Sequence, residues 1–167
     1  MRRAIAVALL IVTSILLQTT VLSEIRLLGA KPELLYLLTI SLALLDGPSE
    51  GAVVGFFGGM SEDFLLHQPK GITALTLTLL GYAIGLSRQY IVSASPLLPT
   101  MLVAAGTFVG AMFHGTVSFL LGQQTQFAYL ARTAMLSGLY GGLLTPLLYP
   151  VIRRLSESSK PRRVVRW

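Results

Sequence analysis

Long uncharged stretches alternate with short polar turns along this chain. Residues 4–22 carry no charge and follow Arg2 and Arg3. Further apolar stretches cover 51–67, 71–87, 98–121 and 129–152, and prolines, glutamines or charged residues separate them. About 20 apolar residues cross a bilayer as a helix. The pattern therefore predicts helices that span a membrane.

The stretch 34–45 is apolar but too short to cross unaided. Its residues would extend about 18 Å as a helix, against a hydrocarbon core of about 30 Å. Either the helix extends over Glu33 and Asp46 to gain length, or it lies at an angle inside the protein. We predict an all-α integral membrane protein, a compact bundle of about six transmembrane helices over 1–152, with a basic cytoplasmic tail at 153–167.

The composition excludes several classes of protein and of functional site. Hydrophobic residues make up 53% of the 167 positions and charged residues 12%, about half of what globular domains carry. Six helices leave no room for a soluble catalytic domain. Cysteine is absent and there are two histidines, without an H-E-x-x-H motif, so thiol chemistry is excluded and a zinc site is not expected. We predict a protein that is not an enzyme, with no cofactor, metal or nucleic-acid partner.

Lysine and arginine predict the orientation, because they concentrate on the cytoplasmic side. With six crossings, the side with both termini holds nine of them: Arg2, Arg3, Arg88, Arg153, Arg154, Lys160, Arg162, Arg163 and Arg166. The other side holds four: Arg26, Lys31, Lys70 and Arg132. Both termini are therefore expected in the cytoplasm. The C-terminal tail either binds anionic lipids or docks an acidic cytoplasmic partner.

Small residues recur four positions apart in the apolar stretches. The glycines predicted to form flat helix faces are Gly51, Gly55, Gly59, Gly81, Gly85, Gly106, Gly110, Gly138 and Gly142. Such faces let helix backbones approach closely in a membrane. They serve packing within one bundle, or they meet a second copy or another membrane protein. The oligomeric state stays open.

Two neighbouring carboxylates, Glu62 and Asp63, are predicted at membrane depth, where charged residues are costly and often functional. Asp63 is expected to face the interior, held by backbone donors or by a cation, with Arg132 as its best partner and Lys70 as another. Glu62 lies about 100° further round the helix and is expected to point to the headgroups. The alternatives are a structural ion pair, or ligand binding or proton movement. Gln18 is expected to bond across to another helix.

These residues together resemble the MreD family of rod shape-determining membrane proteins. The resemblance rests on Gln18, Lys31-Pro32-Glu33, Gly55-Phe56, Gly59, Asp63, Gly71, Gly81-Tyr82, and Pro146 ahead of Arg153-Arg154. Its most specific part is G-F-x-x-G-x-x-x-D over residues 55–63. The likeness covers the whole chain. One departure is Glu33, where several relatives have Asn.

The resemblance implies a non-enzymatic subunit of the bacterial rod complex in the inner membrane. Such a subunit binds the single-pass protein MreC and links MreB filaments to the peptidoglycan synthase RodA and its transpeptidase partner. The fold it implies is similar to substrate-binding subunits of energy-coupling-factor vitamin transporters. A small-molecule-binding subunit of such a transporter is therefore the alternative function.

Overall fold

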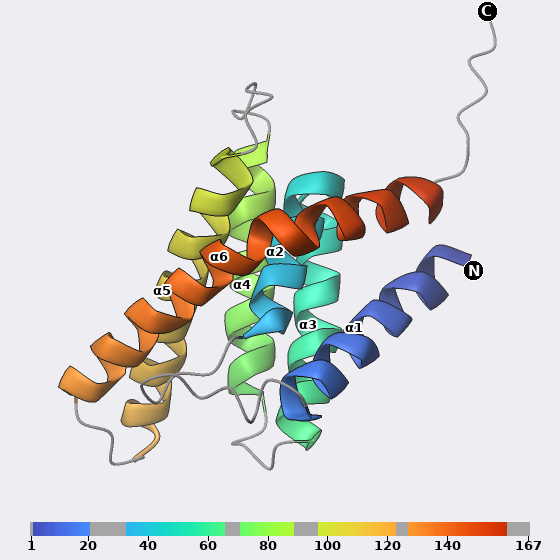
Figure 1. Ribbon diagram of the computed structural model, residues 1–167. Helices are drawn as coiled ribbons and strands as arrows, with labels where there is room; N and C mark the ends of the chain where they lie inside the picture. Colours follow the sequence, from blue (N-terminus) through green and yellow to red (C-terminus); the bar gives the residue numbers. More distant parts are fainter. Residues whose placement is uncertain (1, 21–32, 66–70, 89–96, 123–126, 160–167) are drawn as a thin grey trace, which may run out of the picture.

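The computed structural model describes residues 2–20, 33–65, 71–88, 97–122 and 127–159, and it is helical almost throughout. Six helices form in these ranges (Figure 1): α1 (Arg2–Thr20), α2 (Leu34–Asp46), α3 (Pro48–Leu65), α4 (Ile72–Ser87), α5 (Leu97–Leu120) and α6 (Phe127–Ser159). Pro32 lies outside the described residues, as does the tail after Ser159.

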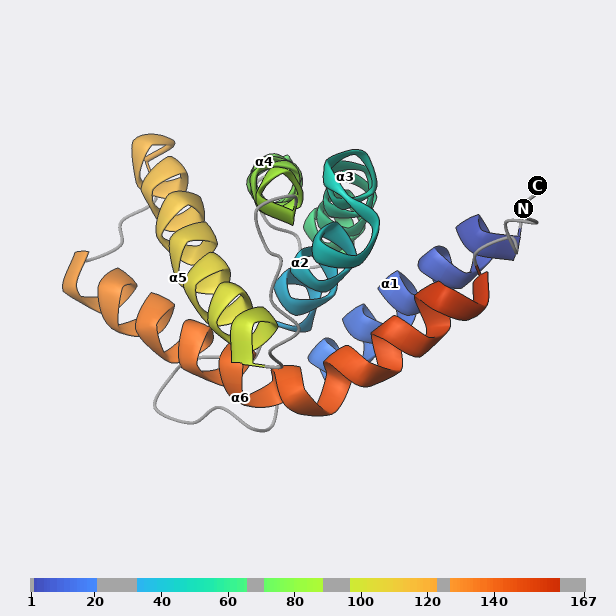
Figure 2. The same ribbon diagram turned by 90° about the horizontal axis from the view of Figure 1, so that it is seen from above.

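Most helix boundaries fall within a few residues of those predicted, because prolines and glycines mark them. Pro48 is the first residue of α3, where the missing N–H of proline leaves no helix bond unmade. The prediction that the last helix ends at Arg153 is wrong, since α6 continues to Ser159. This helix contains Pro146 and Pro150 and is bent in Figure 2, as expected when proline removes backbone bonds.

The short helix α2 lies at the centre of the molecule. Figure 2 shows it between a row formed by α3, α4 and α5 and a second layer formed by α1 and α6. Every side chain from Leu34 to Ala43 is buried. A helix that is apolar on all sides is stable where protein surrounds it. Of the two alternatives for this segment, the structure supports the one inside protein.

Glycines bring α3 and α4 into backbone contact. A Cβ atom placed on Gly59 would lie 2.5 Å from the Cα of Ala74, and one on Gly51 would lie 2.6 Å from the carbonyl oxygen of Gly81. Gly55 meets the backbone of Leu77 in the same way, and Gly85 meets Pro48. These four positions admit no side chain, so α3 and α4 pack at the distance that glycine allows.

Glycines also bring α5 and α6 into close contact, which makes a second glycine contact line, or seam, beside the one between α3 and α4. A Cβ atom on Gly138 would lie 2.8 Å from the carbonyl oxygen of Ala104, and one on Gly142 would lie 3.1 Å from the Cβ of the same residue. Both seams lie within one chain. The structure thus places these glycines at packing contacts inside the bundle, rather than at a face left for a partner.

The outer surface is apolar. Two helices, α5 over Leu97–Leu120 and α6 over Ala128–Ser158, are long and apolar enough to cross a membrane, and α1, α2 and α4 contain shorter apolar helices. Large side chains such as Met101, Leu120 and Leu143 are more than 70% exposed. These features are those of a helical membrane protein, in which lipid covers such side chains.

Candidate functional site

Asp63 is held by the start of the next helix. Its side chain is fully buried, and Oδ2 accepts hydrogen bonds from the backbone N–H of Gly71 at 2.9 Å and of Ala74 at 3.2 Å. The first N–H groups of a helix have no partner within it and carry partial positive charge. Gly71 occupies the N-cap position of α4 with a φ of 101° and has no side chain to cap it. Asp63 therefore caps α4 from α3.

The expected ion pair between Asp63 and Arg132 is wrong. Arg132 is exposed on α6, whereas Asp63 is 0% exposed and bonds to backbone donors. The alternative of backbone donors is the one that the structure shows. A helix N-terminus satisfies a carboxylate without burying a second full charge, which explains why no arginine is needed there.

Glu62 also turns inward, contrary to prediction. Its side chain is only 9% exposed, and Oε1 accepts a hydrogen bond of 2.7 Å from Nε2 of Gln18 on α1. The expectation that it points to the headgroups is wrong, because the side chain is buried in the bundle, where it meets Gln18 of α1 and lines a pocket with Thr73 of α4. The expectation that Gln18 bonds across to another helix is confirmed.

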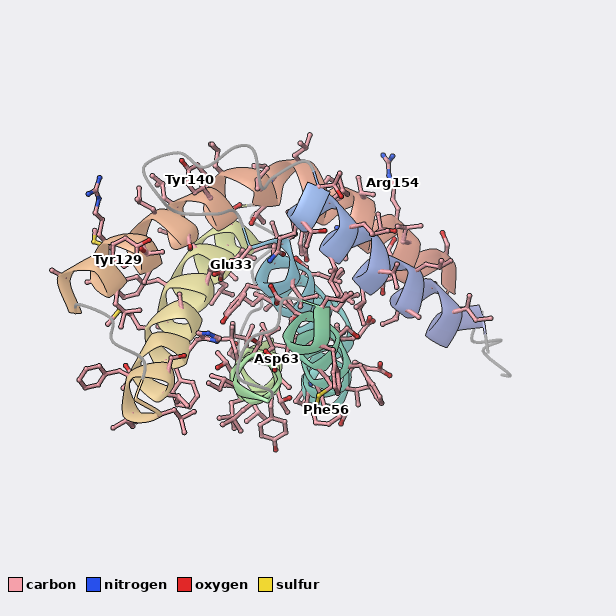
Figure 3. The ribbon with its side chains drawn as sticks, turned by 90° about the horizontal axis from the view of Figure 1, so that it is seen from below. Glu33, Phe56, Asp63, Tyr129, Tyr140 and Arg154 are labelled. Atoms are coloured by element: carbon pink, nitrogen blue, oxygen red, sulfur yellow. The ribbon has the colours of Figure 1, made fainter. Side chains whose placement is uncertain are left out.

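A pocket of about 160 Å³ lies beside these residues. Five helices, α2 to α6, and the residue before α2 contribute to its wall. The polar lining residues are Glu33, Tyr36, Glu62, Thr73, His114 and Thr133. Ala111, Gly115, Leu130 and Ala134 complete it. Figure 3 labels Glu33 and Asp63 among the helices, and Phe56, Tyr129 and Arg154 at the periphery.

Glu33 and His114 each bring an unpartnered polar atom to this pocket. Oε2 of Glu33 and Nδ1 of His114 are buried without a hydrogen bond in the part of the chain that the structure describes. Glu33 stands at the N-cap position of α2 but makes no capping bond with its side chain. The carboxylate of Glu33 therefore does not cap α2.

The family comparison decides the identity of the chain. A family model described as rod shape-determining protein MreD matches residues 1–157. The chain belongs to the MreD family. This match covers α1 to α5 and all but the last two residues of α6, including the carboxylates and glycines described above. Searches of curated proteins and of solved structures found no match.

Membership in the MreD family connects this chain with the determination of rod shape. Among the described residues, no three His, Cys, Asp or Glu side chains are grouped to hold a metal ion. Polar groups do gather at the pocket and around Asp63.

The opposite end of this MreD-family chain carries its own polar contacts. Oγ of Ser156 on α6 donates to both carboxylate oxygens of Asp46 at the end of α2, at 3.2 and 3.0 Å. Nε of Arg153 lies 2.8 Å from Oε1 of Glu157, one turn further along α6, and both side chains are exposed. The bond to Asp46 fastens the last turns of α6 to the central helix.

Sequence reasoning missed Glu33 and His114 as neighbours in one pocket. His114 lies on α5 and Glu33 precedes α2, 81 positions earlier in the sequence. One signal was present: Glu33 directly precedes a helix that is apolar on every side. A carboxylate beside such a buried helix has little route to solvent.

Proposed function

We propose that this chain is a non-enzymatic scaffold subunit of the rod complex. It binds an MreC-like single-pass membrane protein and, through it, couples MreB filaments to RodA and its transpeptidase partner. The family match over residues 1–157 carries this proposal. A helical bundle with a broad apolar surface suits a protein that works by binding other membrane helices.

An apolar groove between α1, α2 and α6 is the face proposed for that partner. It has a volume of about 430 Å³, and its thirteen lining residues are apolar except Thr13 and Ser14. Figures 1 and 2 show the first turns of α1 extending away from the row formed by α3, α4 and α5, on the same side as the C-terminal arm of α6. The last turn of α1 meets α3, where Gln18 bonds to Glu62. Small residues in an apolar groove, here Ala6 and Ser14, permit the close approach by which membrane helices associate.

Filling this groove is expected to release the partner. Thr13→Trp places a large ring in the groove from an exposed position on α1. Co-purification of an MreC-like partner in mild detergent should fall by about tenfold or more, the effect of losing a well-packed contact. Thr116→Trp, at an exposed threonine of α5 outside the groove, is the matched control and should bind normally. Equal binding by both variants would place the interface elsewhere.

Six crossings with both ends in the cytoplasm of the bacterial inner membrane complete the proposal. The start of α1 and the end of α6 lie at the same side of the molecule in Figures 1 and 2, which supports it. A fluorescent protein fused after Trp167 should fluoresce, and alkaline phosphatase fused there should be inactive. Active phosphatase would require an odd number of crossings.

A transporter subunit of the energy-coupling-factor type is the second candidate function. The polar pocket beside Glu62 is the observation in its favour. Co-purification with a pair of ATPases and tight binding of a vitamin, without an MreC-like partner, would reverse the order of the two proposals.

A further inference from the structure

The described lining of the pocket has carboxyl, hydroxyl and imidazole groups but no lysine or arginine. Its ten described lining residues include Glu33 and Glu62, and none of them is Lys or Arg. Three of the polar ones, Tyr36, Thr73 and Glu62, are at least nine-tenths buried. The pocket is thus a polar cavity built from five helices, not a cluster of acids on a surface.

The unpartnered atoms in this pocket are suited to accept hydrogen bonds. Oε2 of Glu33 is an acceptor whenever the carboxyl group is ionised, and Nδ1 of His114 is one in a neutral ring that carries its proton on Nε2. A buried carboxylate without a partner is costly, so a group that donates hydrogen bonds and carries positive charge would stabilise it. An ammonium group supplies three donors and one charge.

The size of the pocket agrees with this chemistry. About 160 Å³ is room for roughly five water molecules, or for an ammonium group with a few carbon atoms. A bare metal ion fits less well, because the described His, Asp and Glu residues form no group of three around one point.

We propose that this pocket binds a ligand through its primary ammonium group, with Glu33 as the main acceptor. Two sources carry that group: a soluble amine such as ethanolamine, and the headgroup of phosphatidylethanolamine. The proposal goes beyond the scaffold function and does not depend on it.

Competition between lipids tests the proposal on the purified full chain. The chain is incubated with equal amounts of phosphatidylethanolamine and phosphatidylcholine of the same acyl chains, and bound lipid is measured by native mass spectrometry. Phosphatidylcholine has no N–H donor and serves as the matched ligand. The wild-type chain should retain phosphatidylethanolamine in preference, or should bind free ethanolamine in a separate titration. A preference for phosphatidylethanolamine would identify the ligand as the lipid headgroup. Binding of free ethanolamine would identify it as a soluble amine.

Two variants complete the experiment. Glu33→Gln keeps the size of the side chain and removes its charge, and amine binding should weaken by about tenfold, as for a lost hydrogen bond to a charged group. Glu157→Gln, an exposed glutamate at the far end of α6, should bind like the wild type. Equal retention of both lipids together with no binding of free ethanolamine would overturn the proposal, and so would amine binding that is unchanged in Glu33→Gln. Co-purification with an MreC-like partner, measured on the same variants, tests the scaffold function separately.

Discussion

Gly59→Leu is expected to abolish accumulation of the folded protein. Even the first atom of a side chain at this position would lie 2.5 Å from the Cα and 2.6 Å from the backbone nitrogen of Ala74. Backbone atoms cannot rotate away as a flexible side chain does, so α3 and α4 would have to separate. Overpacking of a core costs about 1–3 kcal/mol and occasionally more. We expect the upper end, because the neighbouring contact at Gly55 would open with it.

A matched variant separates this effect from added bulk alone. Ala105 is exposed on α5, so Ala105→Leu adds a similar side chain on the outer surface. It should accumulate normally by immunoblot and support rod shape in a complementation assay, while Gly59→Leu should do neither. Normal levels and normal cell shape with Gly59→Leu would show that α3 and α4 do not meet closely at this point.

Asp63→Ala is expected to lower stability strongly. It leaves the N–H groups of Gly71 and Ala74 without their acceptor, and an unsatisfied buried donor costs about 1–3 kcal/mol. It also removes a negative charge from the positive end of α4, worth about 0.3–1 kcal/mol or more when buried. Together we expect a loss of about 2–4 kcal/mol, measured as a lower midpoint of thermal unfolding in detergent.

Asp63→Asn distinguishes capping from a simple need for a polar residue. Asparagine keeps a carbonyl oxygen that accepts the same bonds and loses only the charge, so its effect should lie between those of the wild type and of Asp63→Ala. Hydrogen exchange at the first turn of α4 should quicken most in Asp63→Ala. If the Asn and Ala variants are equally unstable, or if both behave as the wild type, Asp63 does not cap α4.

The helix boundaries are the part of the fold that the sequence predicts well. Uncharged stretches, prolines and glycines are local features, and helix formation in an apolar stretch depends mostly on local backbone bonds. For this reason Pro48 and the charged turns mark ends close to those observed. The exception is α6, which continues past Arg153 to Ser159, and the Arg153 side chain pairs with Glu157 one turn ahead.

The sequence predicts less well which face of each helix points into the bundle. In a soluble protein polar residues mark the outer face, but lipid is as apolar as leucine and leaves no such mark. Glycine spacing indicates a packing face, although it does not name the partner. That Gly59 meets α4 and Gly142 meets α5 is known only from the structure.

The amino-acid sequence alone predicts the family, the all-helical class, most helix ends and the presence of carboxylates in an apolar setting. The tertiary structure decided which groups those carboxylates meet. Asp63 bonds to backbone N–H groups, which every residue except proline has and which therefore leave no trace in the sequence. Glu62 meets Gln18, 44 positions earlier. Glu33 shares a pocket with His114 only because α3, α4, α5 and α6 pack around the start of α2. Such contacts depend on the packing of whole helices, which no local pattern of residues specifies.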